Sequence, residues 1–372
     1  MERYIMGKVL VVAMGLLVLV TGCAPKEPDP VAIMEIPFRN VAYSAEVKPL
    51  LDKRCVVCHS CYNSPCQLKM SSYEGLDRGA SQKAIYNSKR LETMDPTRLF
   101  IDAQSTEEWR RKDFFSVTEN NATVGFTNSL MLQLLNHKMK NKDNSQGEYN
   151  SESEDLNCTA TRSQLGGYLT KHPNGGMPFG FPALEQKDFE TIALWLSQGA
   201  KGPTAEEQKA LTSPSSQAIP IIAQWEAFLN NEDPKQSMTA RYLYEHLFLA
   251  HINLSKDGKQ LFEVVRSKTP IGEPLDLIAT VRPYDPPGVT RVYYRFRKIH
   301  STIVHKTHMV VTLDDAMLAR VHELFIEPEW LQTPFIADYE PIKSANPFRS
   351  FEQIPPPEPD TSFCWIMFNT SL

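Results

Sequence analysis

The sequence predicts a mainly α-helical first domain with a large insertion, followed by an incomplete α+β region. Amphipathic helical segments begin near residues 44 and 185, and residues 60–174 between them are far more than a simple connection needs. Beyond residue 216, helical segments mix with an alternating strand at residues 291–297. A length of 372 residues and a hydrophobic content of 42% suit two globular domains.

The segment Cys55-Val56-Val57-Cys58-His59 is the most informative motif in the chain. Two thiols three residues apart, followed at once by an imidazole, form the attachment pattern of c-type haem. The cysteines add to the porphyrin vinyl groups as thioethers, and the histidine ligates the iron. A redox cysteine pair or half of a zinc site would not explain the adjacent histidine. We therefore expect one covalently bound haem c, held by Cys55, Cys58 and His59.

The elements around this motif predict that residues 40–202 form a cytochrome c-like domain. Ser44 is expected to cap a helix that leads into the motif, with Val47, Leu50 and Leu51 on its apolar face. A second helix is expected from about Glu185 to a glycine C-cap at Gly199, packing across the first through Phe189, Ile192, Trp195 and Leu196.

A glycine-rich loop, Gly175-Gly176-Met177-Pro178-Phe179, precedes that second helix. A methionine thioether on a constrained loop is a common sixth ligand of haem iron. Met177 is therefore the expected second axial ligand, with His172 as its rival and a loop methionine that only fills a gap as the alternative. His137 lies beside Lys138 in a predicted helix and is expected at the surface.

The insertion and the second region contain further predicted elements. In the insertion, we expect a helix capped by Thr106 that runs through Trp109 and Phe114, a helix marked by Met131, Leu132 and Leu135, and a polar loop at residues 141–155. Residues 203–216 are expected to be a linker. In residues 217–355 we expect helices at 223–230 and 240–251, turns at 283–288, a strand at 291–297 and a helix capped by Asp314.

Histidines of the second region do not make a metal site in this prediction. His305 and His308 would lie on opposite faces of a strand, and His246 and His251 diverge on a helix. His300 and His322 remain as single residues. The net charge of −5 and dispersed Lys and Arg give no reason to expect nucleic acid, and no phosphate-binding loop indicates a nucleotide.

The N-terminus predicts export. Arg3 and Lys8 precede an uncharged run that is short for a membrane span and ends in Val20-Thr21-Gly22-Cys23. We expect residues 1–23 to be a lipoprotein signal peptide with Cys23 lipidated, and residues 24–39 to be a tether; the alternative is an ordinary signal peptide with a chance cysteine. A lipid-anchored periplasmic protein is expected, and Ala24 favours the outer membrane.

Four cysteines remain after lipidation and haem attachment: Cys61, Cys66, Cys158 and Cys364. In an oxidising compartment, a disulfide could join Cys66 to either Cys61 or Cys158, and the sequence does not choose between these partners. Free thiols are the alternative.

Several segments, within and beyond the haem motif, together carry a more specific resemblance. They are Leu51–Lys69 (LDKRCVVCHSCYNSPCQLK), Ser72–Leu76, Arg78–Ala80, Pro96–Thr106 and Pro173–Gly180. Together they resemble the bacterial fatty acid cis/trans isomerases, over about Phe38 to Pro355. The haem segment with its additional cysteines is the most specific part of the resemblance.

The resemblance implies a haem-containing envelope isomerase. Such an enzyme converts cis double bonds in the acyl chains of membrane phospholipids to trans, which lowers membrane fluidity under stress. It implies His59 as the proximal ligand and Met177 as a permanent or displaceable sixth ligand, with no nucleotide or reducing cofactor.

The C-terminus departs from the family pattern, because the isomerases it resembles are considerably longer. Codons exist for residues 356–372 that, read one nucleotide out of register, give a family-like Ala-Arg-Thr-Arg-Tyr-Gln-Phe. We therefore expect a C-terminally truncated chain with a frameshifted tail, in which Cys364 is not a family cysteine. A lipid-anchored electron-transfer cytochrome and an inactive remnant are the competing functions.

Overall fold

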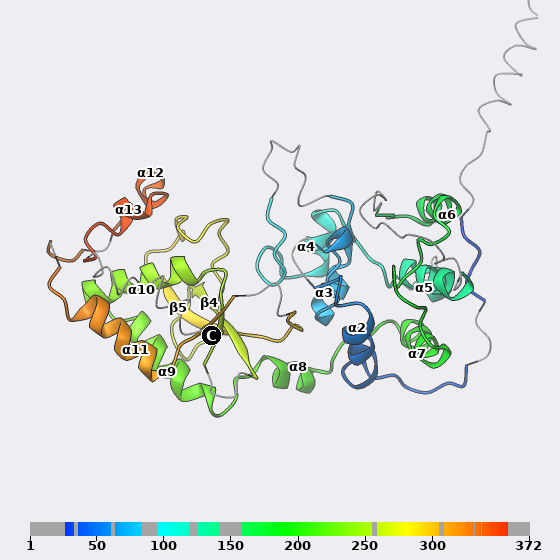
Figure 1. Ribbon diagram of the computed structural model, residues 1–372, viewed down its shortest axis with the longest axis horizontal. Helices are drawn as coiled ribbons and strands as arrows, with labels where there is room; N and C mark the ends of the chain where they lie inside the picture. Colours follow the sequence, from blue (N-terminus) through cyan, green and yellow to red (C-terminus); the bar gives the residue numbers. More distant parts are fainter. Residues whose placement is uncertain are drawn as a thin grey trace, which may run out of the picture. The chain divides into compact units, whose positions relative to one another are not determined.

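The computed structural model describes residues 27–32, 36–60, 64–83, 95–119, 125–141, 158–254, 259–304, 309–330, 332–335 and 337–355. The chain forms two compact units (Figure 1). Unit 1 comprises Met1–Thr93 and Ser105–Pro203, and unit 2 comprises Met94–Gln104 and Thr204–Leu372. The described residues are mainly helical with two small sheets, so the expected mixture of α and β structure is confirmed.

Unit 1 is built mainly from helices. Its elements are η1 (Tyr43–Val47), α2 (Lys48–Arg54), η2 (Pro65–Gln67), α3 (Tyr73–Arg78), β1 (Ala80–Ser81), α4 (Thr106–Arg111), β2 (Phe114–Phe115), η3 (Phe126–Asn128), α5 (Leu130–Lys140), α6 (Arg162–Lys171) and α7 (Gln186–Ser197). The short strands β1 and β2 pair antiparallel. The helix expected around Met131 is therefore confirmed as α5, whereas the polar loop predicted at 141–155 lies almost wholly outside the described residues.

The predicted packing of the last helix of unit 1 on the first is confirmed. The side chains expected on the apolar face of α7 are all buried: Phe189, Ile192, Trp195 and Leu196. The ring of Trp195 lies 6.0 Å from that of Tyr43 in η1. The side-chain oxygen of Gln198 accepts a hydrogen bond of 3.1 Å from Val41 N. After α7, Gly199 adopts φ +87°, the left-handed conformation that ends many helices.

Two predicted helix caps are wrong. Ser44 lies inside η1, which begins after Ala42 and has no side-chain cap. The cap of α4 is Ser105, whose hydroxyl accepts a hydrogen bond of 3.3 Å from Glu108 N, and not Thr106. The second error arises because the adjacent Ser105 and Thr106 compete for the same capping role, whereas the first arises because the helix begins before Ser44. Phe114 was expected in this helix but lies in β2.

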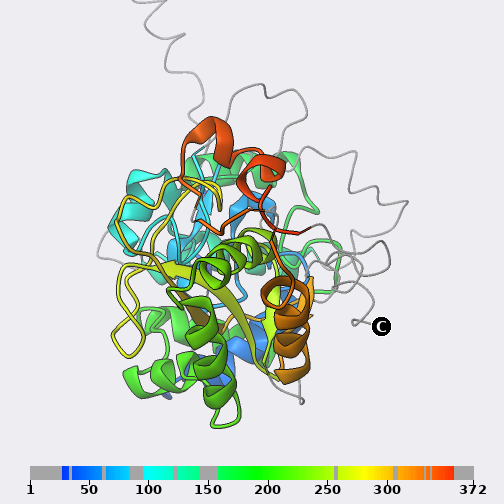
Figure 2. The same cartoon turned by 90° about the vertical axis from the view of Figure 1, so that its left-hand side faces the viewer.

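Unit 2 packs helices on a four-stranded sheet of order β5-β4-β3-β6. Its elements are α8 (Ala205–Thr212), α9 (Ala218–Leu229), α10 (Pro234–Leu247), β3 (His251–Asn253), β4 (Leu261–Ser267), β5 (Tyr293–Ile299), β6 (Val310–Thr312), α11 (Asp315–Val321), η5 (His322–Ile326), α12 (Pro341–Ser344) and α13 (Pro347–Ser350). Strand β4 pairs antiparallel with β3 and β5, and β3 pairs parallel with β6. Helices α9, α10 and α11 share one apolar core with the sheet (Figure 2).

Several predictions for unit 2 are confirmed and two are corrected. The strand at 291–297 is β5, and Asp314 caps α11 by accepting a hydrogen bond of 2.9 Å from Met317 N. The segment expected as a linker contains α8, because Thr204 and Glu207 form a capping box. His251 begins β3 and does not belong to the preceding helix, since α10 ends at Leu247. His305 and His308 lie outside the described residues.

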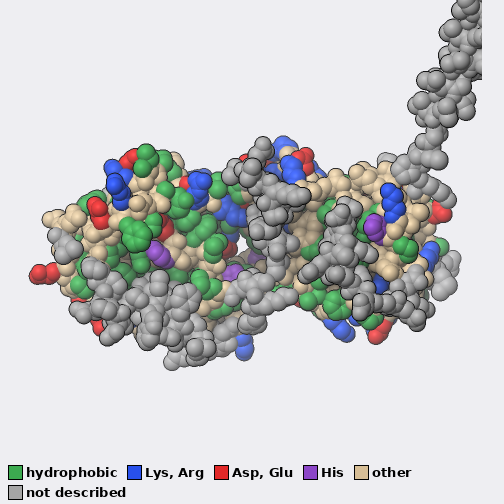
Figure 3. Space-filling view, turned by 45° about the horizontal axis from the view of Figure 1, so that its top comes forward, with side chains coloured by type: hydrophobic (Ala, Val, Ile, Leu, Met, Phe, Trp, Pro, Cys, Tyr) green, Lys and Arg blue, Asp and Glu red, His purple; other side chains and the backbone are tan. Residues whose placement is uncertain are grey.

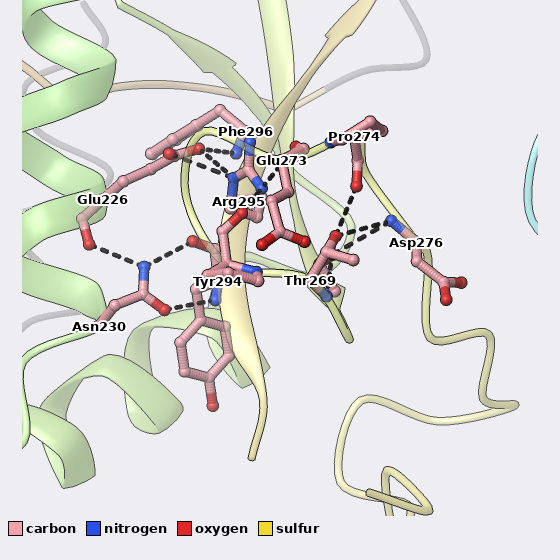
Figure 4. A network of polar contacts seen from close by, with 11 residues as sticks. Glu226, Asn230, Thr269, Glu273, Pro274, Asp276, Tyr294, Arg295 and Phe296 are labelled. Atoms are coloured by element: carbon pink, nitrogen blue, oxygen red, sulfur yellow. Dashed lines mark hydrogen bonds and ion pairs between the residues drawn. The ribbon is translucent and has the colours of Figure 1, made fainter.

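Side chains from α9 satisfy the outer backbone groups of β5, which lies at an edge of the described sheet (Figure 4). The Glu226 carboxylate accepts a hydrogen bond of 2.8 Å from Phe296 N and forms an ion pair of 3.3 Å with Arg295. Asn230 donates to Tyr294 O at 2.9 Å and accepts from Tyr294 N at 2.8 Å. These bonds take the place of a neighbouring strand, and they fix α9 against the sheet edge.

The surface of unit 2 mixes apolar and charged side chains. On the face seen at the left of Figure 3, Lys and Arg side chains are scattered among apolar ones and form no continuous stripe. This distribution agrees with the dispersed basic residues of the sequence. Within the described ranges, no helix is long and apolar enough to span a bilayer.

Replacing Glu226 by alanine tests the role of the edge contacts. We expect Glu226→Ala to lower the free energy of unfolding by about 3 kcal/mol, because it leaves the Phe296 amide without its acceptor and Arg295 without its ion-pair partner. Urea denaturation measures this change. The control is Glu232→Ala, which removes an exposed ion pair with Arg291 and should cost under about 0.5 kcal/mol. Equal losses in the two variants would contradict the role assigned to Glu226.

Candidate active site

Unit 1 contains a cavity of about 290 Å³ that brings the predicted site residues together. Cys55, Cys58, His59 and Met177 all line it, although more than a hundred residues separate the first three from Met177. The other lining residues are mostly apolar: Arg54, Val57, Pro65, Cys66, Leu68, Met70, Ala80, Phe115, Val117, Leu130, Met131, Leu134, Leu135, Thr159, Tyr168, Gly175, Pro178, Phe179 and Phe181.

The cysteine side of the cavity continues directly from α2. Cys55 N donates to Leu51 O at 2.8 Å, and His59 N donates to Cys55 O at 3.0 Å, so helical turns carry the motif into the cavity wall. The Cys55 and Cys58 thiols are free. Burial raises the pKa of Cys55 to about 12, whereas Cys58 is exposed. Both thiols are thus available for a covalent bond to a group in the cavity.

His59 is held in the orientation that a metal-ligating histidine needs. Its Nδ1 donates to Leu68 O at 3.1 Å, and its ring is buried. Burial also lowers the pKa of His59, which favours the neutral imidazole. When Nδ1 carries the proton, Nε2 keeps a free lone pair for a metal ion. A second contact, from Met70 N to His59 O at 2.7 Å, fixes the backbone.

The segment that supplies Leu68 O is anchored at two points. A disulfide joins Cys66 to Cys158, which selects between the two pairings that the sequence left open. Next to it, the buried guanidinium of Arg78 donates to Gln67 O and lies over the rings of Trp109 and Phe114. Cys61 lies outside the described residues.

The loop of Met177 rests on helix α5. Met177 N donates to Leu134 O at 3.0 Å, and His137 Nε2 donates to Pro173 O at 2.7 Å. Gly176 packs so closely that a Cβ there would lie 2.6 Å from Lys138 N. His137, expected at the surface, is half-buried and holds the loop.

His172, the rival of Met177, is not among the residues that line the cavity. Its ring stacks on that of Tyr168, with the ring centroids 4.7 Å apart. The geometry therefore brings Met177, and not His172, to the cavity that contains His59.

Histidines of unit 2 occupy packing positions. Three of the described ones make ring contacts: His246 with Tyr242 at 3.9 Å, His300 with Phe100 at 4.9 Å and His322 with Phe228 at 5.1 Å. The fourth, His251, begins β3. Across the described ranges there is no cluster of three or more His, Cys, Asp or Glu side chains that could hold a metal ion.

Two parts of the site were not predicted from the sequence: a further portion of the cavity wall, and the arginine that precedes the cysteines. Leu134 and Tyr168 from α5 and α6, together with Phe115 from β2, line the cavity. Arg54 donates to Pro182 O at 2.5 Å and to Ala183 O at 3.1 Å, so it joins the cysteine side to the chain that follows the Met177 loop. The spacing of apolar residues in the sequence predicted helix α5, but it did not predict that the Met177 loop packs on this helix.

The close approach of Gly176 to α5 can be tested directly. We expect Gly176→Ala to lower the free energy of unfolding by about 1–3 kcal/mol, since the new methyl group would overlap the Lys138 backbone. Thermal and urea denaturation measure this change. Gly125→Ala is the control, because the nearest atom there is 3.8 Å away, and its effect should stay within about 0.5 kcal/mol. A neutral Gly176→Ala variant would show that the loop does not pack as described.

The disulfide makes a second prediction. Peptide mapping under non-reducing conditions should recover Cys66 linked to Cys158, and a link from Cys66 to Cys61 would contradict the structure. Replacing both Cys66 and Cys158 by serine should cost about 2–4 kcal/mol of unfolding free energy, because the bond closes a long loop in the unfolded chain.

Comparison with known proteins identifies the family. Residues 94–359, which are most of the chain, match the model of the fatty acid cis/trans isomerase family. The match includes the Met177 loop and most of unit 2, and it begins after the Cys55–His59 motif. Searches of curated proteins and of solved structures found no match. The chain therefore belongs to the fatty acid cis/trans isomerase family and is a cis–trans isomerase by that membership.

Proposed function

We propose that this protein converts cis double bonds in phospholipid acyl chains to trans, using one haem c held in the cavity of unit 1. Family membership supports a fatty acid isomerase. The observation that carries the haem proposal is the meeting of Cys55, Cys58, His59 and Met177 in one cavity with mostly apolar walls.

The residues present fit a haem. The two free thiols match the two vinyl groups of the porphyrin, and the Nδ1 hydrogen bond of His59 leaves Nε2 for the iron. Apolar walls suit the body of the ring, and Met177 can supply a thioether as second axial ligand. On this proposal, unit 1 is a cytochrome c-like domain.

Bound haem would supply an iron centre that draws electron density from the alkene, lowers its double-bond order and takes no net electron over the cycle. The chain supplies the environment for this step. Cys55 and Cys58 fix the ring, while His59 holds the iron through a neutral imidazole. Leu134 and Phe115 help to keep water out of the cavity.

The cellular setting is also part of the proposal. The signal-like residues 1–23, whose structure lies outside the described residues, support a lipid anchor on Cys23 at the periplasmic side of the envelope. An anchored enzyme would stay beside its phospholipid substrate and would adjust membrane fluidity under stress. The proposal requires no nucleotide or reducing cofactor.

Replacing His59 by alanine tests the proposal in protein expressed with c-type haem maturation. Membranes carrying the protein receive a cis-unsaturated phospholipid, and gas chromatography quantifies the trans acyl chains. We expect His59→Ala to lower trans product by roughly 100-fold or more, because the loss of a metal ligand should exceed the 10–100-fold effect of losing a residue that orients one. The thioethers of Cys55 and Cys58 would still retain the haem.

The exposed His246 provides the matched control, since His246→Ala should leave product formation unchanged. Absorbance at the haem bands reports haem content in each variant. A wild-type chain with intact haem and reversible redox titration but no trans product would instead be a lipid-anchored electron-transfer cytochrome. Absence of both haem and product would indicate an inactive remnant.

A further inference from the structure

The loop that carries Met177 is fixed at several points along its length. Before the methionine, Pro173 O accepts from His137 Nε2 at 2.7 Å. At the methionine, the backbone amide donates to Leu134 O at 3.0 Å. Close packing of Gly176 on the backbone of Lys138 leaves no room for a Cβ. Moving the Met177 backbone away from the cavity would therefore require the loop to leave α5.

Arg54 binds the chain directly after the same loop. Its guanidinium donates to Pro182 O at 2.5 Å and to Ala183 O at 3.1 Å, just after the segment that carries Met177. Arg54 also precedes Cys55 directly and lines the cavity. The residue before the first haem-attaching cysteine thus ties down the chain that follows the methionine. If haem binds as proposed, His59 and Met177 would be the residues that hold its iron.

The cavity wall is open to solvent at a small apolar rim. Val57 lies between the two cysteines and is 43% exposed, and Phe181 beyond the methionine loop is 49% exposed. Both side chains line the cavity, and the exposed Cys58 lies next to Val57 in the chain. Many of the remaining lining residues, such as Leu135 and Val117, are buried. The edge of a group bound in the cavity would be reached at this rim.

We propose that a cis-unsaturated acyl chain contacts the haem at its edge, on the rim formed by Val57 and Phe181, while Met177 remains on the iron. This inference rests on the proposed function, since it requires the haem. Two apolar side chains beside the ring edge suit a hydrocarbon chain, which needs no polar partner. When bound, the haem would supply the centre that lowers the double-bond order without net electron transfer, so no oxidant or reductant would be consumed.

The first test asks whether the acyl chain displaces Met177. Ferric protein is titrated with oleate, with binding followed by equilibrium dialysis and the methionine-to-iron charge-transfer band followed by absorbance. We expect the band in the free protein and an unchanged band at saturation. A band that disappears as oleate binds would overturn the proposal, as would its absence from the free protein. Met177→Ala defines the spectrum without the thioether.

The second test changes the rim. We expect Val57→Asp and Phe181→Asp each to weaken oleate binding about tenfold and to lower kcat/KM for isomerisation similarly, with haem content and the charge-transfer band unchanged. Phe38→Asp is the matched control, because Phe38 is 79% exposed and is not among the cavity-lining residues. Equal binding in all three variants would overturn the rim as the contact site.

These readouts separate the two proposals. Protein that matures without haem would refute the proposed function itself. Protein that holds haem and forms trans product, yet loses the charge-transfer band on binding oleate, would refute only the edge contact. In that case the acyl chain would reach the iron.

Discussion

The hydrogen bond from Met177 N to Leu134 O is the contact on which the geometry of the cavity depends. It brings a distant loop onto α5, so that a thioether lies in the same cavity as His59. The bond forms at this place because Gly176 allows the two backbones to approach closely. A larger residue at position 176 would hold the loop away from the helix, and the cavity would lose one of its walls.

The histidine side of the cavity is held by contacts of a different kind. A short segment after the motif provides Leu68 O for His59, and the Cys66–Cys158 disulfide and the buried Arg78 fix that segment. These covalent and hydrogen-bonded anchors hold the short helix η2, which is the regular secondary structure in the described part of this stretch. The orientation of His59 thus depends on Leu68 O, nine residues further along the chain, and on the contacts that fix the segment around Leu68.

In unit 2, the backbone groups at the β5 edge of the sheet need hydrogen-bond partners. Glu226 and Asn230 on α9 satisfy the outer backbone groups of β5 at Tyr294 and Phe296. The edge formed by β5, covered in this way, offers no template for pairing with another chain. The family match covers most of this unit together with the Met177 loop. Family membership thus rests on the region that carries the methionine, whereas the haem proposal rests on the motif before it and on the cavity that they share.

Local features could be predicted from the amino-acid pattern alone: the Cys55–His59 motif, the apolar faces of α5, α7 and α11, and the cap at Asp314. Each depends on spacing within a few residues, and such spacing is written directly in the chain. Prediction from the sequence was less reliable where adjacent residues compete to cap the same helix, as Ser105 and Thr106 do. Three features emerged only from the folded chain: the choice of Cys158 over Cys61, the presence of Met177 and not His172 in the cavity, and the bonds by which Arg54 joins α2 to the chain after the Met177 loop. These outcomes depend on contacts between residues far apart in the chain, because packing, and not local spacing, sets which of several chemically suitable partners come within reach.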